Sequence, residues 1–283
     1  MGLSLRDVKE RISSTKKTSQ ITKAMYMVSS SKIRRSQKNY AKYQDFVDNI
    51  ASLVATVLSK ATDYVHPMLV KREIKKTAYI LISSDTGLAG PYNANVFKEF
   101  ERISASDTDY LVGTLGRKAF SYAKNKGLNL LNENATLVRD DVMFMDIVPL
   151  AKKFIALYLD GKIDRLVIVY NHFVNSLTTG VVTKELLPID CVNGEVSPVE
   201  YLFEGGVEKT LNDLLPMYVN ATLYGIILDA KTAEHSSRMN AMRQATDNAD
   251  EVIGKLQLSY NRARQSAITT ELIDIIAGAG AVK

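Results

Sequence analysis

Residue types that carry chemistry are sparse in this sequence and do not form a catalytic pattern. The histidines His66, His172 and His235 stand far apart and share no metal-ligand spacing with the single cysteine, Cys191. The turn at 83–90, SSDTGLAG, lacks the Gly-x-Gly-x-x-Gly order of dinucleotide-binding loops and the Lys-Ser/Thr of a P-loop. No nucleophile elbow, carboxylate pair or His-Glu-x-x-His motif stands out. We therefore expect no catalytic site, cofactor or metal, with a nucleotide-dependent enzyme as an alternative because strand-to-helix turns can bind phosphate.

Basic residues are concentrated at the N-terminus. The chain has 283 residues and a net charge of +5, but residues 1–43 alone carry +9, which leaves −4 for residues 44–283. A basic arm of this kind calls for an acidic partner, which can be nucleic acid, an anionic membrane or an acidic protein surface, unless it is simply a solvated helix face. A basic coiled-coil nucleic-acid-binding protein is therefore a second alternative. The lack of interleaved exposed aromatics along the arm argues against it.

Composition and chain ends favour a soluble protein. Hydrophobic residues make up 46% and charged residues 24% of the chain, and the single cysteine excludes an internal disulfide. The N-terminus, MGLSLRDVKERISS, has no apolar core typical of a signal peptide and carries acids unlike a transit peptide. No apolar run approaches the ~20 residues that span a bilayer. We expect a bacterial protein that reaches a membrane only through a partner or at the membrane surface.

Both ends of the chain lack proline and follow a helical spacing. Apolar or small residues recur every three or four positions from Leu5 to Val57, with a hydroxylated stretch from Thr15 to Ser29, and again from Met239 to Ala267. A second stripe, Ile21, Met25 and Val28, predicts that the middle of the first helix meets something besides its coiled-coil mate. We expect shaft helices over 1–66 and 206–283 that pair antiparallel.

Strand and helix patterns alternate in the centre of the chain, over residues 67–205. The expected strands are 78–82, 110–112, 165–170 and 180–183, and the expected helices lie near 91–103, 118–126 and 146–159. Such alternation predicts a mostly parallel sheet. The fold class is therefore α/β: a long antiparallel coiled coil of N- and C-terminal helices plus a central Rossmann-like domain.

Four stretches of the chain resemble a known family. They are KKTSQITKAM with VSSSK at 16–32, SSDTGLAGPYNAN at 83–95, RMNAMRQATDNA at 238–249 and YNRARQSAITTELIDIIAGA at 260–279. These four stretches resemble, in sequence and in their order along the chain, motifs of the gamma subunit of F-type ATP synthase. Ala89 stands where many relatives have cysteine, and the cysteine-containing insertion of the chloroplast form is missing, so thiol regulation is not expected.

The resemblance implies a central-stalk rotor subunit without a catalytic site of its own. Its two long helices would turn inside a ring of alpha and beta subunits and couple proton flow through the membrane c ring to ATP synthesis or hydrolysis at the beta subunits. The epsilon subunit is a further implied partner, and nucleic acid is not. The complex would lie peripherally on the cytoplasmic face of the cell membrane.

The resemblance also implies roles for three sets of residues. Arg264, Gln265 and Thr269 match positions that contact the catch loop of a beta subunit. Of these, Arg264 and Gln265 would bond to a carboxylate of that loop. Positions at the collar, near an acidic loop of a beta subunit, are Met25, Arg34, Arg35 and Arg238. Positions near the polar loops of the c ring are Phe203 and Glu204.

Overall fold

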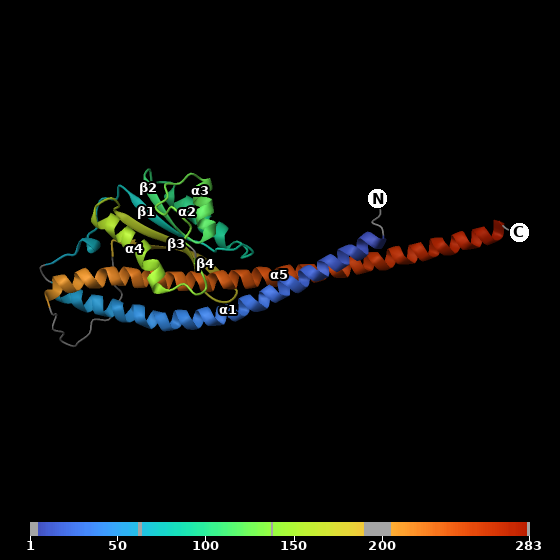
Figure 1. The fold of residues 1–283 in the computed structure, drawn as a ribbon, viewed down its shortest axis with the longest axis horizontal. Coiled ribbons are helices and arrows are strands. Elements are labelled where there is room, and N and C mark those ends of the chain that lie inside the picture. Colours follow the sequence, from blue (N-terminus) through green and yellow to red (C-terminus); the bar gives the residue numbers. More distant parts are fainter. Residues whose placement is uncertain (1–4, 62–63, 137, 190–204, 282–283) are drawn as a thin grey trace. The chain divides into compact units, whose positions relative to one another are not determined.

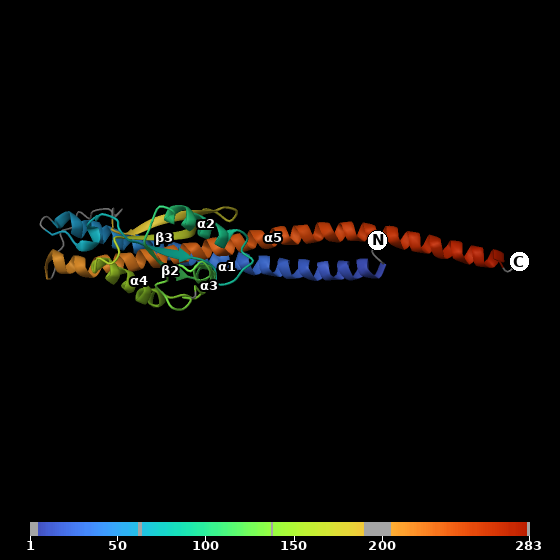
Figure 2. The ribbon, with the colours of Figure 1, turned by 90° about the horizontal axis from the view of Figure 1, so that it is seen from above.

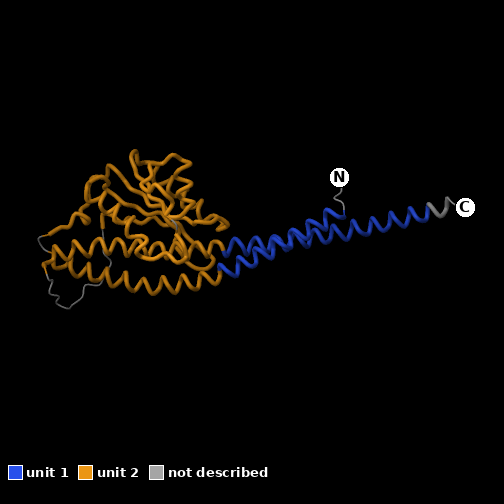
Figure 3. Tube along the Cα trace, viewed as in Figure 1, with its two compact units in different colours: residues 1–29, 239–283 blue, residues 30–238 orange. Residues whose placement is uncertain are grey.

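The computed structural model describes residues 5–61, 64–136, 138–189 and 205–281, with two long helices and a central sheet (Figure 1). The helices are α1 (Leu5–Lys60) and α5 (Gly206–Ala281). The chain divides into two compact units (Figure 3): unit 1 comprises residues 1–29 and 239–283, and unit 2 comprises residues 30–238. Each unit therefore contains one part of α1 and one part of α5, and the two long helices predicted from the spacing are confirmed.

Unit 1 is an antiparallel pair of helical segments, which lie side by side in Figure 2. Ser19 Oγ donates a hydrogen bond to Asp250 Oδ1 at 2.8 Å, and the hydroxyls of Thr22 and Thr246 lie 2.7 Å apart. The predicted seam is confirmed along α1, where every seam position from Val8 to Ser29 is buried or partly buried. The seam is hydroxylated in its middle, so polar contacts there replace apolar packing.

The buried seam of α5 ends at Ala263, one position of the repeat before the predicted end at Ala267. Met242 and Ala249 are buried and Ala263 is partly buried, but Ala267 is exposed. The reason is the register: continuing the pairing of Thr22 with Thr246 puts Leu5, the first residue of α1, opposite Ala263. The segment of α5 that follows has no helix to pack against within unit 1.

Unit 2 is built on a four-stranded sheet with the strand order β2-β1-β3-β4. The strands are β1 (Thr77–Ile82), β2 (Tyr110–Leu115), β3 (Arg165–Phe173) and β4 (Thr179–Leu187). β1 pairs in parallel with both β2 and β3, whereas β4 is antiparallel to β3 because a turn of five residues joins the two as a hairpin. The mostly parallel, Rossmann-like sheet is confirmed.

Helices cover both faces of the sheet. Ala78, Ile80 and Ile82 of β1 face a core shared with α4 (Phe144–Leu159), α1 and α5. Tyr79 and Leu81, which alternate with them, face α2 (Tyr92–Ser104) and α3 (Arg117–Asn125). All six residues of β1 are buried, as expected for a strand that is central and covered on both faces.

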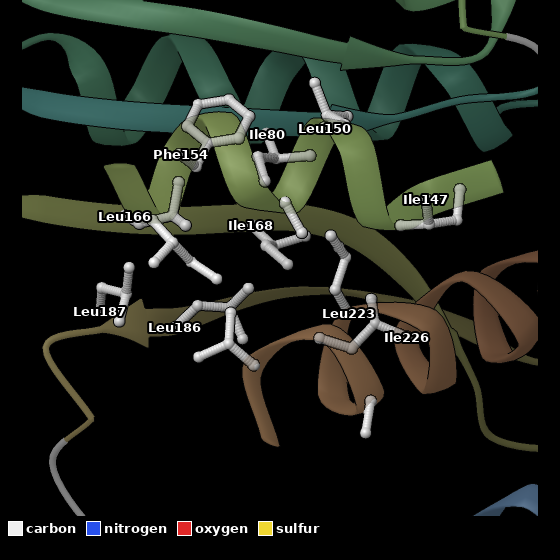
Figure 4. Close-up of a cluster of buried hydrophobic side chains, with 14 of the residues drawn as sticks. Ile80, Ile147, Leu150, Phe154, Leu166, Ile168, Leu186, Leu187, Leu223 and Ile226 are labelled. Atoms are coloured by element: carbon white, nitrogen blue, oxygen red, sulfur yellow. The ribbon is translucent and has the colours of Figure 1, made fainter. Parts of the chain in front are cut away.

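The larger core lies between the sheet and the helices α4 and α5 (Figure 4). Leu223 and Ile226 of α5 face Ile168 and Leu186 of the sheet in this close-up. Burying each such side chain stabilises the fold by ~1.5–3 kcal/mol. The first part of α5, up to Arg238, is thus an integral part of unit 2.

The stretch 127–145, which the sequence pattern leaves unassigned, covers the outer edge of β2. Leu131 N donates to Val112 O at 2.9 Å, and Val112 N donates to Asn129 O at 2.9 Å. The side chain of Asn132 accepts from Thr114 N and donates to Thr114 Oγ1. Single bridges of this kind protect a sheet edge without forming a strand with its own periodicity.

Candidate functional site

The end of α5 is exposed on all sides. Every residue from 264 to 277 is exposed, and the set includes several large apolar side chains: Ile268, Leu272, Ile273, Ile275 and Ile276. The predicted catch-loop residues Arg264, Gln265 and Thr269 lie at the start of this segment, where Thr269 Oγ1 donates to Gln265 O at 2.9 Å. An apolar helix surface of this extent is typical of a surface that a partner covers.

The basic part of α1 also presents apolar side chains to solvent. Ile21 and Val28 are 61% and 55% exposed, whereas Met25 is partly buried. Ile21 and Val28 of the second stripe are thus not covered by α5, and that this stripe meets a further partner stays a prediction. Arg34 and Arg35, which belong to unit 2, are both exposed. Exposed cations of this kind suit an acidic protein partner.

Arg238 differs from the other predicted collar residues because it is only 9% exposed. Its Nη2 donates to Glu234 Oε1 at 2.8 Å and to Thr86 Oγ1 at 3.1 Å. The guanidinium therefore connects α5 to the turn that follows β1. The predicted c-ring residues, Phe203 and Glu204, and Cys191 lie outside the described residues.

The turn after β1 is occupied by the chain's own side chains. Ser83 Oγ accepts a hydrogen bond from Ala119 N at 2.7 Å, and Asp85 Oδ1 accepts one from Arg117 N at 3.0 Å. Both amides belong to the N-terminus of α3, the helix that follows β2, so these side chains tie the turn to that helix. Gly116, with φ +94°, packs so tightly that an added Cβ would lie 2.2 Å from Ser83 O. The side chains of this turn are therefore engaged in holding β1, β2 and α3 together.

A row of charged side chains faces the α/β core from α5. The row consists of Lys231, Glu234, His235 and Arg238, all nine-tenths or more buried, at the spacing i, i+3, i+4, i+7 that defines one helix face. Lys231 Nζ donates to Glu234 Oε2 at 2.8 Å, and to the carbonyl oxygen of Val138 at 2.9 Å. The spacing alone is the signal that reveals this ionic row in the sequence, but it does not identify the residues opposite.

Asp140 lies opposite this row, in the loop between α3 and α4. Its Oδ1 lies 3.1 Å from His235 Nε2 and 3.2 Å from Lys231 Nζ, and its Oδ2 lies 2.7 Å from Lys32 Nζ on α1. The hydrogen bond from His235, with that from Lys32 and the charge of Lys231, holds the pKa of Asp140 well below its usual range, against the opposing effect of burial. Asp140 is therefore ionised and joins three segments of unit 2.

A buried carboxylate, Asp229, connects α5 to the end of β3. Its Oδ1 accepts from Phe173 N at 3.0 Å, and its Oδ2 lies 2.6 Å from His172 Nδ1. Burial raises the pKa of Asp229, and the hydrogen bond from His172 partly offsets this. The contact adds a directional constraint to the apolar packing of α5 on the sheet.

Among the described residues, no group of three His, Cys, Asp or Glu side chains could hold a metal ion. In the same part of the chain, no helix has the length and hydrophobicity required to cross a bilayer.

The fold and the exposed surfaces define a class of protein: an α/β unit carrying two long helices whose far ends present partner-binding surface. The ATP synthase family model matches residues 4–282. The chain belongs to the gamma-subunit family of F-type ATP synthases, the non-catalytic central-stalk component of that enzyme. Neither the family nor the structural neighbours support the nucleic-acid-binding alternative.

Solved structures with a similar fold come from mitochondrial ATP synthases. A chain from the Euglena gracilis rotor in rotational state 1 is 17% identical, with a TM-score of 0.67 over 93% of this chain and 98% of that one. A chain from the OSCP/F1/c-ring assembly of the same organism is 18% identical, with a TM-score of 0.66 over 98% and 94%. One from the central stalk and c ring of Tetrahymena thermophila is 23% identical, with a TM-score of 0.60 over 80% and 99%.

Proposed function

We propose that this chain is the rotating shaft that couples proton flow through a c ring to ATP synthesis or hydrolysis at beta subunits. The observation that carries the proposal is the family match over residues 4–282, together with the bare, apolar end of α5. A shaft of this kind needs no bond chemistry of its own. It acts by presenting different faces to the surrounding subunits and so biasing their conformations.

The proposed contacts with beta subunits use both ends of the chain. Arg264 and Gln265 are exposed and adjacent, so a fork of donors and an amide are available to a carboxylate of the catch loop. Arg34 and Arg35 are exposed cations that suit the acidic loop at the collar, with Met25 as the apolar contact. For Arg238 we propose an indirect collar role, because its guanidinium is engaged by Glu234 and Thr86.

The remaining assignments follow from the same proposal. Phe203 and Glu204 would meet the polar loops of the c ring, and an epsilon subunit would bind beside the α/β unit. The neighbours are described as parts of a rotor, of a central stalk with c ring, and of an OSCP/F1/c-ring assembly, which supports partners of this kind. The assembled enzyme would lie peripherally on the cytoplasmic face of a bacterial cell membrane.

The direct test is reconstitution with alpha and beta subunits. We expect the chain to co-purify with an alpha/beta hexamer and to be required for steady ATP hydrolysis, and the full enzyme in vesicles to pump protons on ATP addition. A chain that bound the isolated c ring or the hexamer but left ATP hydrolysis unchanged would contradict the proposed coupling.

A further inference from the structure

A network of charged side chains in unit 2 connects α5 to α1, to the loop between α3 and α4 and to the turn after β1. Asp140 belongs to the loop between α3 and α4, Lys32 belongs to α1, and Lys231 and His235 belong to α5. One carboxylate thus binds cationic side chains from both long helices. From Lys231 the chain of contacts continues through Glu234 and Arg238 to Thr86, in the turn after β1.

Apolar packing alone constrains a helix weakly against sliding and twisting. The side of α5 that faces the sheet repeats small and branched apolar residues, among them Leu223, Ile226, Ile227 and Ala230. Packing between such surfaces is non-directional, and a packed helix can move past its neighbour by one turn, about 5.4 Å, to an equivalent arrangement. The core therefore fixes which side of α5 faces the sheet, and it resists sliding and small rotations of α5 only through non-directional contacts.

Paired buried charges resist that rotation much more strongly. Lys231 and His235 are 7% and 2% exposed, and turning α5 would separate both side chains from Asp140 while keeping them away from water. The bonds of Glu234 to Lys231 and Arg238 lie within α5 and would move with the helix. An unpaired buried charge is strongly destabilising, so the ionic contacts favour one rotational setting of the helix. Lys32 and Asp140 are about half exposed, so their contact extends the cluster to α1 with a weaker constraint.

We infer that Asp140, with Lys32, Lys231 and His235, is a positioning cluster that locks both long helices to the α/β unit when torque acts between them. The inference rests on the proposed rotor function, because only a rotating shaft applies such torque. Asp140 does not take part in the chemistry of ATP or in proton transfer. It keeps the α/β unit and the helices turning together.

The test uses the complete enzyme in sealed vesicles, with the variant Asp140→Asn and the matched control Asp141→Asn. Asp141 is the adjacent exposed acid, so both variants lose one charge from the same loop. ATP hydrolysis and the limiting pH gradient reached by ATP-driven pumping are measured together. For Asp140→Asn we expect hydrolysis within about twofold of wild type, since no reacting group is altered, but a lower limiting gradient. Asp141→Asn should match wild type in both.

Two results would overturn the inference. One is an unchanged limiting gradient in Asp140→Asn. The other is an equal fall in the rate of ATP hydrolysis and in the limiting pH gradient. Such a result would indicate general loosening of the fold and not a specific loss of coupling when the pH gradient opposes rotation. If Asp140→Asn does not assemble, Lys32→Gln is used instead, because Lys32 is about half exposed and its loss leaves the α5 contacts in place. It should lower the limiting gradient, and a wild-type gradient would again overturn the inference.

The same vesicles separate this inference from the proposed function. If wild-type chain supports neither hydrolysis nor pumping with the other subunits, the rotor proposal itself is wrong. If wild type pumps and the variants reach the same gradient, the rotor proposal stands and only the locking role of Asp140 is wrong.

Discussion

At the residue scale, charged side chains of this protein fall into two environments with different purposes. Arg264, Arg34 and Arg35 are exposed and available to other chains. Lys231, Glu234 and Arg238 are buried and paired with one another or with neighbouring loops. Exposed charges contribute little to folding, whereas buried pairs become strongly destabilising when one member is removed. Substitutions in the two sets should therefore affect assembly and folding, respectively.

Replacing Arg264 tests the first set. Arg264→Ala should leave the thermal melting temperature of the isolated chain unchanged, because the side chain is exposed. It should reduce ATP hydrolysis and proton pumping in the reconstituted enzyme by about tenfold, as expected for the loss of a charge-assisted bidentate contact worth ~1.5–3 kcal/mol. Nucleotide binding to isolated beta subunits should not change.

Arg262 provides the control for that experiment, since it is an exposed arginine two positions earlier and thus on another side of the helix. Arg262→Ala should behave like wild type. Equal turnover and pumping in the wild type and Arg264→Ala would contradict the catch-loop role.

The low pKa of Asp140 predicts a stability difference that depends on pH. Its cationic partners hold the pKa of the Asp140 carboxyl in the folded chain below the ordinary value of 3.8. The ionised carboxylate therefore stabilises the fold fully above pH 3.8, and this contribution is lost as the pH falls below 3.8. Asp140→Asn should therefore unfold more easily than wild type at pH 7, and the difference should narrow below about pH 4.

Urea unfolding of both proteins at a series of pH values measures this. The Asp141→Asn variant serves as a control, because no ion pair of the described structure involves Asp141 and its difference from wild type should stay small. A gap between wild type and Asp140→Asn that stayed constant down to pH 3 would show that the carboxylate charge is not what stabilises the loop.

At the scale of elements, α5 changes its environment along its length. No residue from 221 to 238 is exposed, since this stretch is surrounded by α1, the sheet and the loops of unit 2. Residues 242–263 bury a single stripe against α1, and residues 264–277 bury nothing within the chain. Folding of the chain therefore depends on the first part, and the last part is available for a partner.

Truncation after Ala263 should leave the stability of the isolated chain almost intact. The removed residues have no described packing partner, so the free energy of unfolding should change by less than ~0.5 kcal/mol. Truncation after Asp247 also removes Ala249 and the contact of Asp250 with Ser19, and it should lower the helix content of unit 1. Circular dichroism during thermal unfolding measures both effects, and equal losses in the two truncations would contradict this division of α5.

The expected elements were predicted well because each depends on local pattern. The spacing of α1 repeats every three or four residues over its whole length, and β1 is a short, continuous apolar run. The stretch 127–145 was not assigned, because its bonds to Val112 and Thr114 involve single residues without a period. The antiparallel orientation of β4 follows from the short turn that joins it to β3 and not from any pattern within the strand.

At the scale of the whole molecule, the two units differ in how they are held together. Unit 2 has two apolar cores, one on each face of the sheet. Unit 1 has one seam, and hydroxyl contacts such as that of Thr22 with Thr246 occupy its middle. Few buried apolar contacts imply a low free energy for local opening. Unit 1 should therefore open more readily than unit 2 when the chain is alone.

Amide hydrogen exchange tests this ordering. In the isolated chain, residues 264–281 should exchange first, the remainder of unit 1 next, and β1 and β3 last. After assembly with alpha and beta subunits, the amides of 264–281 should become strongly protected, while those of β1 and β3 should change little. Protection of 264–281 in the isolated chain would mean that another part of the chain covers the end of α5.

The sequence by itself determined the two long helices, the alternation of strands and helices between them, the basic arm and the family. These features are written in local spacing, composition or contiguous motifs, so no folding is needed to read them. Only the tertiary structure decided that Asp140 meets Lys231, 91 positions away, and that Arg238 points inward to Thr86. Partners so far apart in the chain are brought together by the packing of α5 on the sheet, and a one-turn shift of that helix would have given each charge a different neighbour.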